Sequence, residues 1–387
     1  MSSALELRGV SRSFGGTDVL HDVSLNVPTS GCVALLGTSG SGKSTILRIT
    51  AGLEQPTTGQ VLVDGQDMKA VPVEQRGMAL VSQKALLFPH LNVIDNVAFP
   101  ARMAGQRRAQ ARRHAIEYLE LVQLAEYARR PVGELSGGQE QRISLARALA
   151  RNPRILLLDE PFAFLDVQLR EDMYDLIHNI RAQLAPTIVV VTHDRQEASI
   201  LADSIAVLDD GHILQHGTVH ELHYQPATHA VNRLLGGLNA VPGHVHDGKH
   251  HSVLGHLQVQ DGAVEGPAFL VVRQEALNLI PPSEAGPSTL KGSVSGLTSL
   301  GARTLVRVNI SPSPSASASA SLTFSDSNPP APSDGGKWPI PDVSASNTRD
   351  EGSTATLTVD VAGHPNLLPG QVVGVGVQDD RGWAVPA

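Results

Sequence analysis

The chain has 387 residues, 41% of them hydrophobic, and a formal net charge of −8, with 38 acidic and 30 basic residues. This length favours two domains with a sizeable core, and the acidic balance argues against a nucleic-acid partner. Cys32 is the only cysteine, which excludes an internal disulfide. The N-terminus lacks a signal-peptide pattern and no apolar run approaches the ~18 residues that cross a bilayer, so we expect any membrane role to depend on a partner.

Residues 1–235 alternate apolar, β-branched runs with amphipathic stretches, which predicts an α/β domain with a partly parallel sheet. Residues from about 86 to 150 show a helical pattern that includes the stretch Ala101–Leu124, and we interpret them as a helical subdomain inserted into the core. The basic run in this part is typical of a solvated helix face and consists of Arg107, Arg108, Arg112 and Arg113. The runs with the length of buried strands are Cys32–Leu36, Ile155–Leu158 and Ile188–Val191.

A glycine-rich segment follows the first of these strands and precedes the helical run Thr45–Ala51. This order and spacing predict a P-loop, in which backbone N–H groups and a helix N-terminus bind phosphate. Lys43 is expected to reach the β- and γ-phosphates of ATP, and the Ser44 hydroxyl to bind Mg²⁺. The predicted nucleotide-binding residues in this segment are Gly37, Thr38, Ser39, Gly40, Ser41, Gly42, Lys43, Ser44 and Thr45.

Two carboxylates, Asp159 and Glu160, end the apolar strand Ile155–Leu158. Asp159 is placed to hold Mg²⁺, and Glu160 to polarise the attacking water as a general base. An apolar strand that ends in Asp-Glu is moderately specific alone. Combined with the upstream P-loop, it predicts a P-loop NTPase that hydrolyses ATP.

A second glycine-rich segment, Leu135-Ser-Gly-Gly-Gln139, opens a helix expected to run through Ala150. Ser136 is a plausible N-cap, and the exposed N–H groups of a helix start form another anion site. Because the chain already has one phosphate loop, this second site indicates that a second molecule takes part.

These motifs resemble the ATP-binding family of ABC transporters, and the resemblance extends over nearly the whole chain. In that family two copies pair head to tail, with ATP between the P-loop of one copy and the signature of the other. The resemblance implies a homodimer that uses ATP and Mg²⁺, in which Ser136 and Gly138 contact the γ-phosphate across the dimer.

Other residues match the family one at a time. Phe14 resembles the aromatic residue that stacks on adenine, with a core phenylalanine as the alternative. Gln83 resembles the glutamine that touches Mg²⁺ and water and senses the membrane partner, and His193 the histidine that holds the γ-phosphate. Asp166 resembles the aspartate of the dimer seam.

Two positions depart from the family pattern, because Phe164 replaces a small residue and Ser82 an aromatic one. Both are expected near dimer or coupling surfaces. Neither position is among the catalytic residues that the motifs and the resemblance imply, which are Lys43, Gln83, Glu160 and His193.

Residues 236–387 show short strand-like runs between Gly and Pro, which predicts a small all-β domain. Within it, Ser311–Ser353 is rich in Ser, Ala and Pro, and we interpret it as a disordered insertion. The tail resembles the OB-like TOBE or MOP-type regulatory domain of one importer branch. The segments that carry this resemblance are Gly237–Gly243, Val272–Glu275 and Leu368–Gln371.

That resemblance implies import through two integral-membrane permease subunits, with an extracytoplasmic solute-binding protein, at the cytoplasmic face of the membrane. Val71–Arg76 and Phe88–Leu91 look like the ferric iron, sulfate and polyamine side of the branch, with ferric iron slightly favoured. A polyamine, sulfate or phosphonate importer stays open. Alternatives of another class are a soluble ABC ATPase outside transport and a non-catalytic ATP-binding regulator.

Five histidines of the tail lie close together in the sequence, and histidine is the commonest metal ligand. A metal-sensing site is conceivable. The intervening Asp247, Gly248 and Lys249 favour a solvated hairpin turn instead. These histidines are His244, His246, His250, His251 and His256.

Overall fold

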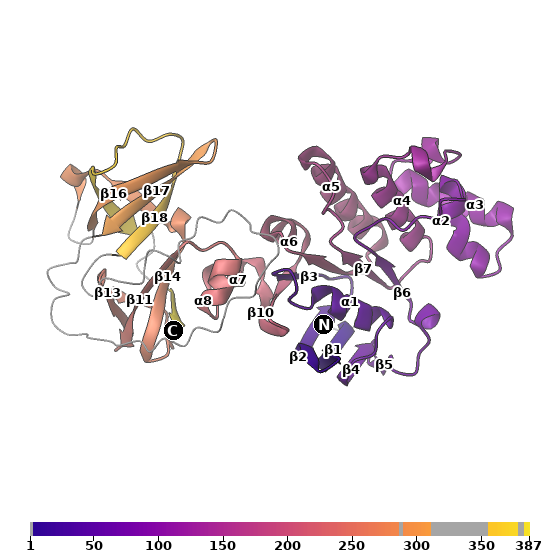
Figure 1. Ribbon diagram of the computed structural model, residues 1–387, viewed down its shortest axis with the longest axis horizontal. Coiled ribbons are helices and arrows are strands. Elements are labelled where there is room, and N and C mark those ends of the chain that lie inside the picture. Colours follow the sequence, from indigo (N-terminus) through magenta and orange to yellow (C-terminus); the bar gives the residue numbers. More distant parts are fainter. Residues whose placement is uncertain (1–2, 286–288, 311–354, 378–382) are drawn as a thin grey trace. The chain divides into compact units, whose positions relative to one another are not determined.

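The computed structural model describes residues 3–285, 289–310, 355–377 and 383–387, so the expected insertion 311–353 lies outside the described residues (Figure 1). The chain divides into two compact units, Met1–Ala227 and Thr228–Ala387. The division falls eight residues before the boundary expected at 235.

A six-stranded sheet, in the order β10-β9-β3-β8-β7-β6, forms the centre of the first unit. All neighbouring pairs among β3, β6, β7, β8 and β9 are parallel. The edge strand β10 pairs with β9 in the antiparallel direction. Every residue of β3 and β8 is buried, as expected for parallel strands covered on both faces. The strands are β3 (Cys32–Gly37), β6 (Met78–Val81), β7 (Ile155–Asp159), β8 (Thr187–Thr192), β9 (Ser204–Asp209) and β10 (His212–Thr218).

A second, four-stranded sheet in the order β2-β1-β4-β5 is wholly antiparallel. This second sheet was not predicted, although the second half of β2 alternates buried apolar and exposed polar residues in the manner of a half-exposed antiparallel strand. Leu5, Leu20, Ile46 and Leu157 share one hydrophobic cluster, which joins this sheet, helix α1 (Lys43–Ala51) and the central sheet. The strands are β1 (Ser3–Phe14), β2 (Thr17–Pro28), β4 (Thr58–Val63) and β5 (Gln66–Asp67).

Three helices form the region that was predicted to be helical: α2 (Val93–Met103), α3 (Arg108–Leu121) and α4 (Gly137–Leu149). The stretch Ala101–Leu124 is not one helix, because the chain turns at Gly105, whose φ is +88°. Arg108 and Arg112 of the basic run pair with the carboxylate of the buried Asp95, at 3.0 and 2.6 Å. Part of the run therefore joins α3 to α2, and the rest is exposed.

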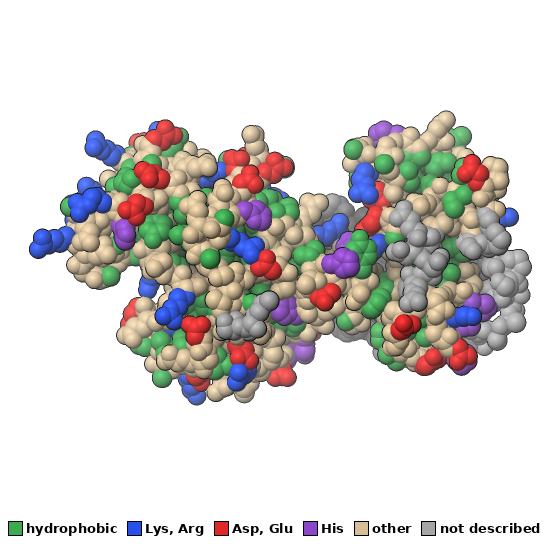
Figure 2. All heavy atoms as spheres, turned by 180° about the vertical axis from the view of Figure 1, so that it is seen from behind, with side chains coloured by type: hydrophobic (Ala, Val, Ile, Leu, Met, Phe, Trp, Pro, Cys, Tyr) green, Lys and Arg blue, Asp and Glu red, His purple; other side chains and the backbone are tan. Residues whose placement is uncertain are grey.

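Four further helices are described, of which α5 has 18 residues and the other three have 6 or 7. Figure 2 shows acidic and basic side chains interspersed on one face of the molecule. The helices are α5 (Val167–Leu184), α6 (Arg195–Leu201), α7 (Val219–Tyr224) and, in the second unit, α8 (His229–Leu234), and the 3₁₀ turns are Val73–Gln75, Ala125–Tyr127, Val132–Glu134, Gln274–Ala276 and Pro282–Glu284.

The second unit holds two five-stranded sheets, in the orders β13-β12-β11-β14-β20 and β15-β19-β16-β17-β18. All strand pairs in them are antiparallel. Val241, Leu270, Val306, Val359 and Val375 belong to one buried core shared by both sheets. This confirms the predicted small all-β domain and is consistent with an OB-like fold.

The strands of the first of these sheets are β11 (Asn239–His246), β12 (Lys249–Ser252), β13 (Gly255–Gln258), β14 (Gly266–Val272) and β20 (Trp383–Pro386). Those of the second are β15 (Leu277–Ile280), β16 (Leu290–Ser299), β17 (Arg303–Ile310), β18 (Ala355–Ala362) and β19 (Val372–Val377). The predicted hairpin turn is also confirmed, because Asp247 and Gly248 have φ values of 51° and 68° between β11 and β12.

Candidate nucleotide site

The candidate site lies where four parallel strands of the central sheet end. The P-loop follows β3, Gln83 follows β6, Glu160 follows β7, and His193 follows β8. Parallel strands that are neighbours in a sheet deliver their following loops to the same edge, which is where open α/β sheets bind ligands. The fold therefore collects residues that are far apart in the sequence.

Two glycines of the P-loop occupy restricted positions, Gly37 because of a backbone atom close by and Gly42 because of its positive φ. A Cβ on Gly37 would lie 2.1 Å from the carbonyl oxygen of Leu208, and one on Gly42 would lie 2.5 Å from Leu20 Cδ2. Gly42 also caps α1 in the left-handed region, with φ 99°. These constraints let the loop turn tightly onto the N-terminus of α1, whose N–H groups favour an anion.

Lys43 lies inside the loop and is only 5% exposed. Its Nζ donates to the carbonyl oxygens of Gly37 and Thr38, at 2.9 and 2.6 Å. Burial lowers the pKa of the Lys43 ammonium, and the nearby Glu160 and Asp159 carboxylates oppose that shift. The phosphates of a bound nucleotide would therefore compete with the two carbonyl oxygens for the hydrogen bonds of this ammonium.

The Ser44 hydroxyl donates to Asp159 Oδ1 at 3.0 Å, which joins the P-loop to the end of β7. Burial raises the pKa of Asp159, and the hydrogen bond from Ser44 opposes that shift. A hydroxyl and a carboxylate side by side form a set of hard oxygen donors, which fits Mg²⁺.

Glu160 holds the centre of the site. Gln83 Nε2 donates to one of its carboxylate oxygens at 3.0 Å, and His193 Nδ1 lies 3.2 Å from the other. Glu160 also has φ 43°, an unfavourable backbone conformation for a residue with a side chain. Eight other non-glycine residues of the described chain also have a positive φ, so the argument for Glu160 rests on its contacts with Gln83 and His193.

A polar network behind His193 was not predicted from the sequence. Thr192 accepts a hydrogen bond from Asp194 N at 2.9 Å and donates to the buried Glu197 carboxylate. Arg170 Nη1 lies 3.5 Å from Asp194 and 3.8 Å from Glu197. The signal in the sequence was a threonine directly before His193, but only the fold shows what it contacts.

Comparison with known proteins bears on this geometry. A family model described as ABC transporter matches residues 20–163. A Rhizobium meliloti protein named Fe(3+) ions import ATP-binding protein FbpC 1 is 40% identical over 300 residues, which cover 76% of this chain and 84% of that protein. The chain belongs to the ATP-binding family of ABC transporters. It is therefore an ABC ATPase.

Two other relatives of this ABC ATPase are also named as ATP-binding proteins of import systems. The Escherichia coli K12 protein FbpC, named for Fe(3+) import, is 39% identical, with 71% of this chain and 79% of that protein covered. The Photorhabdus laumondii protein CysA, named for sulfate/thiosulfate import, is 45% identical, with 62% and 68% covered.

Two solved structures match somewhat more than half of the ABC ATPase. CbiO1 of Clostridium perfringens, described as part of an ABC transporter complex, aligns with a TM-score of 0.54 and 25% identity, covering 57% of this chain and 91% of that one. A dimeric ATP-binding cassette bound to ADP and phosphate aligns with a TM-score of 0.51 and 32% identity, covering 56% and 98%. The second structure supports nucleotide binding by this fold.

The segment Leu135–Gln139 leads into helix α4, as predicted. Ser136 is its N-cap and forms a capping box with Gln139, whose backbone N–H lies 3.3 Å from Ser136 Oγ. A Cβ on Gly137 would meet nothing within 4 Å, so the backbone there is open to an approaching group. In the described residues the hydrogen bonds of Ser136 stay within its own helix start.

Helix α4 is also joined to the loop that carries Gln83. Gln141 Nε2 donates to the carbonyl oxygen of Ser82 at 3.4 Å. In the sequence, Ser82 stood out only as a departure from the family pattern. Its backbone oxygen, which any residue would supply, makes this contact.

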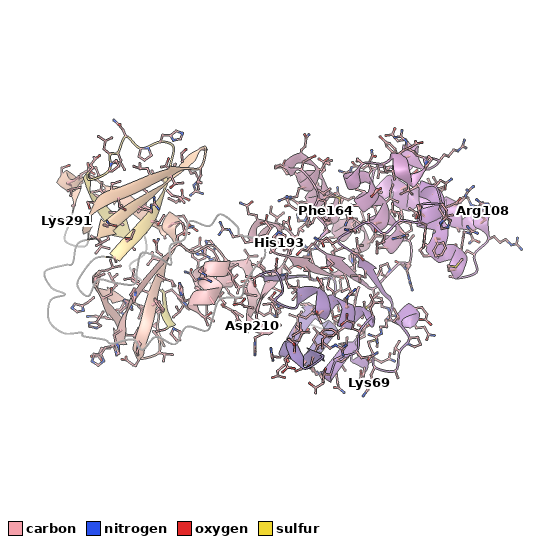
Figure 3. The ribbon with its side chains drawn as sticks, in the orientation of Figure 1. Lys69, Arg108, Phe164, His193, Asp210 and Lys291 are labelled. Atoms are coloured by element: carbon pink, nitrogen blue, oxygen red, sulfur yellow. The ribbon has the colours of Figure 1, made fainter. Side chains whose placement is uncertain are left out.

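Three other predicted residues lie outside the cluster around Glu160. Asp166 is the N-cap of α5 and accepts from Leu169 N at 2.9 Å, while the preceding Phe164 is 68% exposed (Figure 3). Phe14 is 41% exposed, and the Arg12 guanidinium lies over its ring at 4.3 Å. Phe14 is therefore a surface residue with an accessible ring, and not a core phenylalanine.

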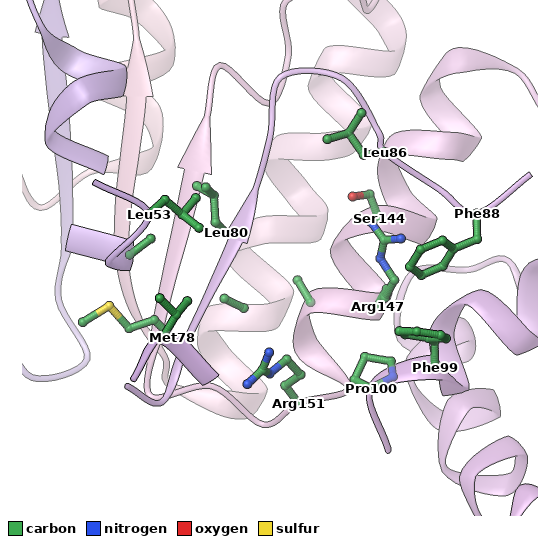
Figure 4. A pocket seen from close by; sticks show the side chains of 14 residues that line it. Leu53, Met78, Leu80, Leu86, Phe88, Phe99, Pro100, Ser144, Arg147 and Arg151 are labelled. Atoms are coloured by element: carbon green, nitrogen blue, oxygen red, sulfur yellow. The ribbon is translucent and has the colours of Figure 1, made fainter. Parts of the chain in front are cut away.

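A pocket of about 330 Å³ opens between β6 and helices α2 and α4 (Figure 4). Its walls include Leu80, Leu86, Phe88, Phe99 and Arg147. Leu86 is 66% exposed, and the Arg147 guanidinium lies 5.3 Å from the centre of the Phe88 ring. Within the part of the chain that is described, no helix is long and apolar enough to cross a membrane.

Proposed function

We propose that this chain is the ATP-hydrolysing subunit of an ABC importer and that the imported solute is ferric iron. The geometry that supports hydrolysis is the Glu160 carboxylate, held between Gln83 and His193 at 3.0 and 3.2 Å. The choice of ferric iron is supported by relatives from Rhizobium meliloti, Streptomyces coelicolor and Escherichia coli, whose names specify Fe(3+) import.

In the proposed reaction, Glu160 accepts a proton from the water that attacks the γ-phosphate in line. Gln83 positions that water, and His193 holds a γ-phosphate oxygen. Lys43 leaves its contacts with Gly37 and Thr38 and donates to the β- and γ-phosphates. Ser44, Asp159 and Gln83 would hold Mg²⁺, which supplies positive charge next to the phosphates when bound.

The proposed active form is a head-to-tail homodimer. The open backbone at Gly137 and the N-cap Ser136 would meet the γ-phosphate bound to the other copy. Gly138 allows close packing there, because a Cβ on it would come within 3.1 Å of Leu169. Asp166 and the exposed Phe164 would lie at the seam, where an apolar ring gains by being covered.

Two integral-membrane permease subunits would dock on the first unit, which thereby works at the cytoplasmic face of the membrane. The pocket beside Leu86 and Phe88 supports this, because it is apolar and open and adjoins the loop that carries Gln83. A segment seated there would act on Glu160 through Gln83. An extracytoplasmic solute-binding protein would deliver the solute, and the second unit would serve as the TOBE- or MOP-like regulatory domain.

Sulfate is the second candidate solute. It is favoured by the Photorhabdus laumondii sulfate/thiosulfate relative, which has the higher identity of 45% over a shorter alignment. A soluble ABC ATPase outside transport is disfavoured because the relatives described above are named as import proteins. A non-catalytic regulator would have no need of a carboxylate held between Gln83 and His193.

The test is uptake of labelled ferric iron by the native host, in the wild type and in a chromosomal Glu160→Gln strain. We expect iron uptake to fall in the mutant, while uptake of sulfate and polyamines is unchanged. A Gly133→Ala strain is the matched control, because a Cβ on Gly133 meets nothing within 4 Å.

Unchanged iron uptake, in cells that express the protein and carry no second iron importer, would refute ferric iron as the solute. Selective loss of sulfate uptake in the same strain would establish the second candidate. If no uptake changed and the protein did not sediment with membranes, the transport function itself would be wrong.

A further inference from the structure

Three histidines of the second unit form a row across neighbouring strands. His244 of β11 pairs directly with His251 of β12, and His251 pairs directly with His256 of β13. Residues opposite each other in adjacent strands point to the same face of a sheet, with Cβ atoms about 4.5–5.5 Å apart. We call His244, His251 and His256 the histidine row.

The row lies on the outer face of this sheet. Val245 and His250, which alternate with the row, are buried at 1% and 0% exposure. His250 Nε2 contacts the carbonyl oxygen of Ala268 at 3.2 Å, so this fourth histidine belongs to the interior. His256, in contrast, is exposed. An ion could therefore reach the row from solvent.

Two members of the row are already in contact. His251 Nδ1 and His256 Nδ1 lie 2.5 Å apart, and their ring centres are 4.3 Å apart. A tetrahedral ion with N–metal distances of about 2.0–2.1 Å would place two ligand nitrogens roughly 3.3 Å apart. The two rings therefore need to separate by less than about 1 Å, which rotation of the exposed His256 side chain can supply.

Additional ligands lie next to this pair. His244 Nδ1 is buried and has no hydrogen-bond partner among the described residues. His246 lies on the same face, two residues further along β11, with its ring centre 6.4 Å from that of His251 and its Nδ1 3.3 Å from Glu265 Oε2. As the described side chains stand, no three His, Cys, Asp or Glu groups converge on one point.

We propose that the histidine row binds a divalent transition-metal ion such as Zn²⁺ or Cu²⁺. His251 and His256 supply two ligands, and water the remaining positions. Imidazole nitrogens suit these ions, whereas Mg²⁺ requires oxygen ligands. The row therefore discriminates against the Mg²⁺ that accompanies ATP, and this site is separate from the transported solute.

Calorimetric titration of the full-length chain with Zn²⁺, in excess Mg²⁺ and without nucleotide, tests the proposal. We expect saturable binding that weakens at least about 10-fold in His251→Gln and in His256→Gln, the lower end of what loss of even an outer partner costs a metal site. His364→Gln is the matched control, because His364 is an exposed histidine of the same unit outside the row. It should bind Zn²⁺ as the wild type does.

Binding of Zn²⁺ by both row variants with wild-type affinity and stoichiometry would overturn the proposal. If either variant failed to fold, the electron paramagnetic resonance spectrum of Cu²⁺ on the wild-type chain would decide. Coupling to two or more imidazole nitrogens is expected at the row. A wild-type spectrum that shows oxygen ligands alone would refute the site.

Discussion

In the first unit, β3, β6, β7 and β8 run in parallel and release their loops at one edge of the sheet, where Lys43, Glu160 and His193 meet. In the described residues of the second unit every strand pair is antiparallel, and His244, His251 and His256 lie opposite one another across β11, β12 and β13. Parallel strands gather residues that are distant in the sequence at the strand ends. An antiparallel meander places neighbours in sequence next to each other along the face of the sheet.

Adding one methyl group to a tightly packed glycine should affect ATP binding in the first unit and stability alone in the second. In the first unit, Gly37→Ala would place a methyl group 2.1 Å from the Leu208 carbonyl oxygen. Overpacking of this kind costs about 1–3 kcal/mol or more, and the strain falls on the phosphate loop. We expect loss of ATP binding, measured by titration with a fluorescent ATP analogue, and a lower unfolding temperature.

Gly133→Ala is the control for that variant, because it adds the same methyl group where nothing lies within 4 Å. It should retain ATP binding and stability. Wild-type ATP binding by Gly37→Ala would show that the loop does not need its tight turn at Gly37 to bind the nucleotide.

Gly243→Ala makes the corresponding change in the second unit. Its Cβ would lie 2.3 Å from the His251 carbonyl oxygen and 2.4 Å from His250 Cε1. We expect the second unit to lose about 1–3 kcal/mol of stability, while ATP hydrolysis by the first unit is unchanged. Because the two units need not unfold together, calorimetric unfolding should be resolved into separate transitions. A loss of ATPase activity equal to that of Gly37→Ala would contradict the independence of the two units.

The smallest expected effect comes from Thr192→Val, which removes the hydroxyl behind His193. That hydroxyl makes two hydrogen bonds, one of them to the Glu197 carboxylate. We expect about 1 kcal/mol of their contribution to act on the transition state, so that kcat for ATP falls roughly fivefold, with little change in KM. Thr192→Ser keeps the hydroxyl and should restore kcat. If the serine variant were as slow as the valine variant, Thr192 would act through packing and not through its hydroxyl.

Local signals in the sequence predicted a large part of the fold. The runs at Cys32, Ile155 and Ile188 became β3, β7 and β8, because continuous apolar runs bounded by turns are typical of buried parallel strands. The turn at Asp247 and Gly248 was predicted from its residue types alone. The approach of Glu160 to Gln83 and His193 was expected only through the family resemblance, since no local pattern specifies it.

Other features could not be predicted, because they depend on tertiary packing. Arg76 lies in a segment that suggested the substrate, yet its guanidinium is buried and donates to the carbonyl oxygens of Thr50, Met68 and Val71. Its role in the fold is therefore to hold the C-terminal end of α1 against the segment Met68–Val71 of the same chain. The histidine row could likewise not be predicted without the strand register. A shift of one residue in that register would move a histidine to the other face of the sheet.

ATP hydrolysis by the purified full-length chain, with and without Glu160→Gln, tests the central claim most directly. Glutamine keeps the size of the side chain but removes the base, and general-base catalysis contributes about 10²- to 10⁴-fold. We predict that the variant binds ATP as the wild type does and hydrolyses it at least about 100-fold more slowly. Hydrolysis at the wild-type rate would show that Glu160 is not the base and would contradict the proposed role of the Gln83–Glu160–His193 cluster.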